Sequence, residues 1–165
     1  MKLRQSLWLY LSILIALILD SYDFNSSFHE IKPNLTLLVL IYWNIAIPDK
    51  IGIYAPLAFG ALYDLLEGTV LGLYALIFVS TAYLCQRFFY QFRVMRIWQQ
   101  SLFIFLLTFF IKLILSLEFY HIQDFEVSLS DEDYMFNALV FSFLSSILWP
   151  LVLFSLRKYR RRFVS

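Results

Sequence analysis

Two ionisable side chains, Asp64 and Lys112, stand inside long apolar stretches of the sequence. A charge at such a position is costly in a membrane unless the protein uses it. Asp64 could bind a partner residue or a ligand in a cavity between helices. Alternatively, its oxygens could accept hydrogen bonds from backbone N–H groups at a broken helix junction. Since nothing nearby completes a catalytic set, we favour the structural or assembly role.

Asp64 belongs to a series with four-residue spacing. Gly52, Pro56, Gly60 and Asp64 would share one face of a helix, because residues i and i+4 are neighbours on a helix. Small residues four apart let helix backbones approach closely in a membrane. We therefore expect this face to contact neighbouring helices or a partner, with Asp64 pointing into the protein.

Asn34, Gly68 and Gly72 extend this predicted contact set, and Asn44 is a further polar residue in the same region. Gly68 and Gly72 frame the start of the helix after Asp64, where the first N–H groups lack helical partners. Asn34 and Asn44 are polar members of the preceding apolar segment. We expect them to form hydrogen bonds between helices, worth roughly 0.6–2 kcal/mol each.

Lys112 lies between the apolar segments FIFLLTFFI and LILSL. A lysine at the bilayer centre costs about 2.5–3.5 kcal/mol on the insertion scale. Snorkelling toward the outer interface or pairing with an acid such as Asp64 would each relieve this cost. Snorkelling needs no partner, and we take it as the simpler expectation.

Other site chemistries find little support in the sequence. His29 and His121 stand alone without ligand spacing, so we expect no metal site and no cofactor. No Walker loop, GxSxG or HExxH is found. The single cysteine, Cys85, lies in an apolar run and cannot form an internal disulfide. We expect a protein that is not an enzyme.

The composition indicates the class of fold. Of 165 residues, 61% are apolar, 20% aromatic and only 15% charged. Globular domains average about 45–50% apolar and about 25% charged residues. We therefore predict an all-α integral membrane protein with one transmembrane domain over residues 1–165. Its first segment has the basic-then-apolar form of a signal peptide, but no small-x-small cleavage site follows, so we read it as a retained helix.

The gaps between charges delimit about six transmembrane helices, since a span needs roughly 20 apolar residues. The predicted helices cover residues 5–21, 34–48, 50–66, 69–88, 97–119 and 134–156. The second and third are short and flank a turn at Pro48, so a re-entrant helical pair is an alternative to two full spans.

An even number of crossings sorts the charges to opposite sides. Eleven of the 13 basic residues fall on the side of both termini, and eleven of the 12 acids fall on the other. Basic residues near helix ends mark the cytoplasmic side, so we predict that both termini are cytoplasmic. Trp8, Trp43 and Trp98 fall near the predicted inner interface, where an indole can anchor a helix.

Basic residues also predict contact with the membrane surface. The loop over 87–98 alternates arginines with aromatic residues and is either an interfacial amphipathic helix or an ordinary basic turn. The C-terminal tail would attract anionic lipid headgroups or simply fix the last helix. We expect no nucleic-acid partner. The predicted surface contacts are Arg87, Arg93, Arg96, Arg157, Lys158, Arg160, Arg161 and Arg162.

Several motifs in order resemble the rod shape-determining protein MreD family in its proteobacterial form. They are KPNLTLLVLIYW at 32–43, the proline turn at Pro48, GALYDLLEGTVLG at 60–72, WQQ at 98–100 and LWP at 148–150. Each motif alone is weak, but their order and spacing are fairly specific. The resemblance covers nearly the whole chain, although Lys112 is not part of the family pattern.

This resemblance implies a multi-pass, non-enzymatic scaffold in the bacterial inner membrane that supports rod shape and lateral peptidoglycan synthesis. The implied partners are membrane lipids, MreC above all, and also MreB, the glycosyltransferase RodA and its class B penicillin-binding transpeptidase. The family fold resembles substrate-binding subunits of energy-coupling-factor transporters. An alternative is therefore a small-molecule or lipid binding or transport subunit, with a pocket near Asp64 and Asn34.

Overall fold

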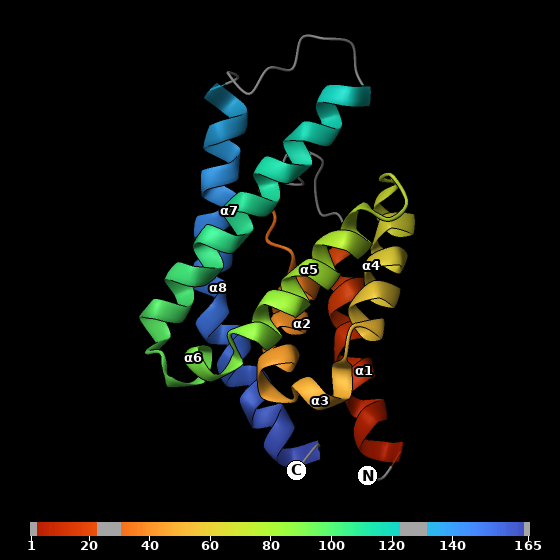
Figure 1. Ribbon diagram of the computed structural model, residues 1–165, viewed down its shortest axis with the longest axis vertical. Coiled ribbons are helices and arrows are strands. Elements are labelled where there is room, and N and C mark those ends of the chain that lie inside the picture. The colour runs from red at the N-terminus through yellow and green to blue at the C-terminus, as the bar shows by residue number, and fades with distance from the viewer. Residues whose placement is uncertain (1–2, 23–30, 123–131, 164–165) are drawn as a thin grey trace. The chain divides into compact units, whose positions relative to one another are not determined.

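The computed structural model describes residues 3–22, 31–122 and 132–163, and all regular secondary structure in these ranges is helical (Figure 1). The helices are α1 (Leu3–Asp20), α2 (Leu35–Ala46), α3 (Pro48–Ile51), α4 (Tyr54–Glu67), α5 (Leu73–Arg87), α6 (Phe89–Val94), α7 (Ile97–Ile122) and α8 (Glu132–Phe163). Among the described residues, one compact unit contains α1 to α6 and α8 from Leu151 onward. A second unit contains α7 and α8 up to Pro150.

Helix α2 forms the core of the first unit. All residues from Thr36 to Asn44 are buried, and a helix that is apolar around its whole circumference belongs in an interior. Helices α1 and α5 both pack against it. Trp43 lies wholly inside, where its indole N–H donates to the Ser12 hydroxyl at 2.9 Å. The expected interfacial role of Trp43 is therefore wrong, because its polar atom has a partner within the protein.

The predicted helix over 50–66 is two helices in the structure. Pro48 starts the short α3, where its missing N–H removes no helical hydrogen bond. Gly52 ends α3 with φ 55°, a left-handed conformation that a residue with a side chain adopts only at a cost. Gly52 therefore does not share the helix of Gly60. Pro56 lies in the first turn of α4, a position that tolerates proline.

The next helix begins later than the predicted residue 69. Gly68 caps α4, and Gly72 takes φ 103° directly before α5 starts at Leu73. These conformations turn the chain back sharply, so that α4 and α5 lie side by side (Figure 1). The loop between the two helices is therefore part of their packing.

Helices α7 and α8 run in opposite directions in the second unit. Tyr134 donates its hydroxyl to the Lys112 carbonyl at 2.6 Å, and Trp149 donates its indole N–H to Gln100 at 3.3 Å. The predicted helix over 134–156 is longer in the structure, because α8 continues through the basic tail to Phe163. Lysine and arginine favour helix, and cations are favourable in its last turn.

Two stretches of the described residues are long and apolar enough to cross a membrane, Ile97–Leu115 and Tyr134–Arg162. Leu7–Asp20 and Leu35–Ala46 are apolar but shorter. The number of spans and the side of each terminus stay predictions. Helix α6 shows that the arginine-aromatic segment is partly helical. Residues 123–131 and His29 lie outside the described residues.

Candidate functional site

The side chain of Asp64 is the centre of the α4–α5 junction and is only 1% exposed. Its Oδ1 accepts from the Thr69 hydroxyl at 3.0 Å and from the Tyr74 N–H at 2.8 Å. Its Oδ2 accepts from the N–H groups of Gly72 at 2.9 Å and Ala75 at 3.3 Å. Four donors thus converge on one carboxylate, in the structural arrangement considered above.

These donors explain why a carboxylate suits this position. The first N–H groups of a helix lack partners inside the helix and carry a partial positive charge. An ionised carboxylate is an acceptor on both oxygens, and charge-assisted hydrogen bonds are the stronger kind. Asp64 therefore holds the start of α5 against the last turn of its own helix, α4.

Gly60 lies one helical turn before Asp64 and faces the same helix. A Cβ atom at Gly60 would lie 2.4 Å from the Ala75 Cα and 2.8 Å from the Tyr74 carbonyl oxygen. Both are backbone atoms, so no side-chain rotation could relieve the overlap. Gly60 therefore permits the close approach of α4 and α5, while contact of this face with a partner stays a prediction.

A second buried carboxylate has the same function at another junction. Asp20, the last residue of α1, is 3% exposed. Its Oδ1 accepts from the Leu35 N–H at 3.0 Å, and its Oδ2 accepts from the N–H and hydroxyl of Thr36 at 2.7 and 2.6 Å. Asp20 thus caps α2 as Asp64 caps α5.

The two junctions follow one design, in which an aspartate in the last turn of one apolar helix caps the next. Sequence reasoning assigned Asp20 only to the acidic outer side and missed this role. An available signal was that Asp20 and Asp64 each lie near the end of an apolar segment and precede the start of the next helix, at Asn34-Leu35-Thr36 and at Gly72.

Asn34 also caps α2, because its side-chain oxygen accepts from the Leu37 N–H at 2.8 Å. This local bond differs from the interhelical bond expected from the sequence, since Asn34 precedes the helix. Asn44 does connect helices, because its Oδ1 accepts from Gln86 of α5 at 2.9 Å. The same Gln86 amide donates to the Gly52 carbonyl at 3.3 Å, which ties the α3–α4 connection to α5.

We expect Asn34→Ala to lower the free energy of unfolding by about 1 kcal/mol, the usual value of an N-cap. Asn34→Ser should retain most of the stability, because a serine hydroxyl can accept the same hydrogen bond. Denaturation of purified protein in mixed micelles would measure both variants. Equal losses in the two variants would show that the cap is not what Asn34 contributes.

Lys112 lies within the second unit, half-buried, with its Nζ 4.7 Å from the centroid of the Phe141 ring. This cation–π contact is attractive when water is excluded. The cation thus has a contact with α8 in addition to its place on α7. Snorkelling toward the outer interface stays a prediction.

The predicted membrane-surface residues lie at helix ends. Arg87 and Arg96 are exposed, as are Arg157, Lys158, Arg161 and Arg162, while Arg160 is half-buried. The side chain of Arg93 lies outside the described part of the structure. Near the tail, Tyr159 donates its hydroxyl to the Trp8 carbonyl at 3.1 Å, which fixes the basic end of α8 to α1.

The chemistry of the buried carboxylates is structural. The transporter-like alternative places Asp64 and Asn34 beside a pocket. In the structure, the Asp64 oxygens accept from backbone N–H groups at the start of the next helix, α5. The Asn34 side-chain oxygen accepts from a backbone N–H of α2, the helix that Asn34 caps. A ligand would have to break these bonds to reach them. The arrangement holds the starts of α2 and α5 in place.

Comparisons with known proteins agree over most of the chain. The family model described as rod shape-determining protein MreD matches residues 2–159. A curated relative, the rod shape-determining protein MreD of Haemophilus influenzae (strain ATCC 51907 / DSM 11121 / KW20 / Rd), is 33% identical over 148 residues. The alignment covers 90% of this chain and 87% of that protein. No solved structure matches. The chain belongs to the MreD family of rod shape-determining proteins.

Proposed function

We propose that this chain is a non-enzymatic, multi-pass scaffold of the inner membrane that holds MreC and the peptidoglycan synthases of the elongation complex. The family match supports a role in cell shape. The observation that carries the scaffold role is that two buried carboxylates in the described part of the chain, Asp20 and Asp64, accept hydrogen bonds from backbone N–H groups at helix starts. Polar groups inside the first unit thus set the arrangement of helices.

Apolar side chains on the outside of the helices support a docking role. Phe136 and Phe143 of α8, both in the second unit, are 64% and 58% exposed. Their spacing of seven residues places them on one face of the helix. We propose that this aromatic face receives the transmembrane helix of MreC. The basic residues near the chain's ends would then face the MreB filament in the cytoplasm.

Depletion of this chain from a rod-shaped host should produce rounded, widened cells, and its expression should restore rods. Microscopy of cell length and width measures the result. Because a scaffold acts through its partners, the restoring chain should also capture MreC after crosslinking in membranes. Cells that keep their shape after depletion would contradict the proposed role.

Phe136→Ala with Phe143→Ala should lower MreC capture about tenfold, because loss of an aromatic anchor at an interface costs on the order of 1.4 kcal/mol or more. Leu65→Ala on α4, an exposed residue of similar character, is the matched control and should leave capture unchanged. Quantitative immunoblots of crosslinked complexes measure both. Equal capture of MreC by the double phenylalanine variant and by Leu65→Ala would show that MreC contacts another face.

A further inference from the structure

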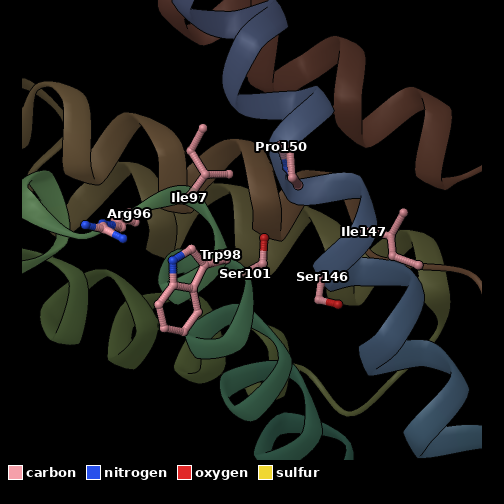
Figure 2. Close-up of a pocket in the computed structure, with 7 residues that line it drawn as sticks. All are labelled: Arg96, Ile97, Trp98, Ser101, Ser146, Ile147 and Pro150. Atoms are coloured by element: carbon pink, nitrogen blue, oxygen red, sulfur yellow. The ribbon is translucent and has the colours of Figure 1, made fainter.

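A groove of about 860 Å³ opens between α7 and α8 in the second unit. It is lined by Arg96, Ile97, Trp98, Ser101, Ser146, Ile147 and Pro150. Figure 2 shows Arg96, Ile97 and Trp98 on the side of α7, with Ser146, Ile147 and Pro150 on α8. The groove is shallow and largely open on one side, as expected of a site on the outer surface of two helices.

The lining combines one cation with hydroxyl groups and apolar walls. Arg96 is the charged residue of the lining, and no acid accompanies it. A guanidinium matches the geometry of a phosphate group and binds it with charge-assisted hydrogen bonds. Ile97, Ile147 and Pro150 offer no polar side-chain atom. An occupant that satisfies both parts has an anionic head and an apolar tail.

The structure holds this groove in shape on both sides. The Arg96 N–H donates to the Gln99 side chain at 3.0 Å, while the Gln99 N–H donates to the Arg96 carbonyl at 3.0 Å. The Gln99 side chain thus accepts from the N–H of the residue before α7, as in one half of a capping box, and it fixes the backbone from which Arg96 extends. The two motifs that resemble the family, at 98–100 and 148–150, also meet beside the groove. There the buried Trp149 donates to the buried Gln100 across the two helices.

The groove lies at one end of a candidate membrane span. The stretch Ile97–Leu115 is long and apolar enough to cross, so Arg96 immediately precedes the apolar segment. A basic residue at such a boundary lies at headgroup depth, and the neighbouring Trp98, which is 62% exposed, is typical of the same layer. The cation, Ile97 and Trp98 thus lie at headgroup depth, while Ser101, Ser146 and Ile147 lie further along the span, toward the acyl chains.

We propose that the groove binds one anionic glycerophospholipid, with its phosphate on Arg96 and the start of its acyl chain against Ile147. The Ser101 hydroxyl lies between these two contacts, where the ester region of the lipid would pass (Figure 2). The inference rests on the proposed membrane location but is independent of MreC and of the scaffold role. It makes a specific lipid part of the α7–α8 unit.

The test uses the full chain reconstituted in nanodiscs that contain equal amounts of phosphatidylglycerol and phosphatidylcholine. The protein is then released into detergent for measurement. Native mass spectrometry should show one phosphatidylglycerol retained on the wild type. Arg96→Gln should lower that occupancy about tenfold, and Ile147→Trp should abolish it by filling the groove. Arg87→Gln, which removes the same charge at an exposed arginine of α5, should retain the lipid. Ile114→Trp, an equal bulk increase at an exposed site of α7, should also retain it.

Lipid occupancy equal to that of the wild type in both Arg96→Gln and Ile147→Trp would overturn the proposal. Equal retention of phosphatidylcholine and phosphatidylglycerol by the wild type would also overturn it. Absence of lipid from the folded wild-type chain would overturn it too, and would leave the groove to a partner's helix. Displacement of the lipid by millimolar glycerol phosphate would assign the site to a free phosphate. The result is separate from the cell-shape test, because a chain that restores rods but binds no lipid refutes this inference alone.

Discussion

Asp64→Ala should be among the most destabilising single substitutions in this chain. It removes the acceptor of three backbone N–H groups and one hydroxyl, at a side chain that is 1% exposed. Each buried donor left without a partner costs about 1–3 kcal/mol. We expect a loss of more than about 3 kcal/mol, a large share of the roughly 5–15 kcal/mol by which proteins are stable. Thermal unfolding of purified protein, followed by size-exclusion fluorescence, measures it.

Asp64→Asn should fall between the wild type and Asp64→Ala. The amide keeps one acceptor oxygen but turns an NH₂ group toward N–H donors, which repel it. Glu67→Gln is the control, because it removes a negative charge from a half-buried residue of the same helix. Its effect should stay below about 1 kcal/mol. An Asp64→Ala protein as stable as Glu67→Gln would show that the N–H groups of α5 find other acceptors, and the role given to Asp64 would be wrong.

The Asp64→Asn variant also allows a test of function in cells, with cell shape as the measurement. If Asp64 acts by ordering α5, cells with Asp64→Asn should lose rod shape in proportion to the loss of folded protein in the membrane. If Asp64 contacted a partner directly, shape would fail at normal protein levels. Comparing immunoblots of membranes with cell width distinguishes these outcomes.

Helix identity follows from the sequence because it depends on local properties. Long runs of Leu, Ile and Phe between charges predicted segments that overlap α1, α2, α5, α7 and α8. Their ends differ from the predicted ones by a few residues, except the C-terminal end of α8, which lies further along the chain. The break at Gly52 could not be predicted, since glycine fits both a helix face with small residues and a left-handed turn. Only the path of the chain after α3 decides between them.

The long-range bonds of the site were beyond sequence reasoning for a different reason. Asp20 accepts from residues fifteen and sixteen positions later, across a loop whose path the sequence does not give. An aspartate after an apolar run is typical of a solvated loop, so charge sorting favoured that interpretation. Asp64 was singled out because its run continues on both sides. Trp43 was misassigned because an interfacial tryptophan and a buried one differ only in whether a partner such as Ser12 is near.

Gly60→Ala provides a test in which two effects have opposite signs. In an ordinary helix interior, alanine is more favourable than glycine by about 1 kcal/mol. Here the added Cβ would lie 2.4 Å from the Ala75 Cα and 2.8 Å from the Ala75 nitrogen. Overpacking of this kind costs about 1–3 kcal/mol, and more when backbone must move. We expect net destabilisation, with a larger loss in Gly60→Leu. Ala58→Leu, on the exposed side of the same helix, should be nearly neutral.

The residue that Gly60 touches is also a donor to Asp64, which makes the two sites dependent on each other. Ala75 donates its N–H to Asp64 at 3.3 Å and lies under Gly60. Displacing α5 with Gly60→Ala should therefore weaken the hydrogen bonds that Asp64→Asn also weakens. A double-mutant cycle should give a combined loss smaller than the sum of the two, by about 0.5 kcal/mol or more. Strict additivity would mean that helix packing and carboxylate capping are separate features, and a stabilising Gly60→Ala would mean that α4 and α5 do not approach so closely.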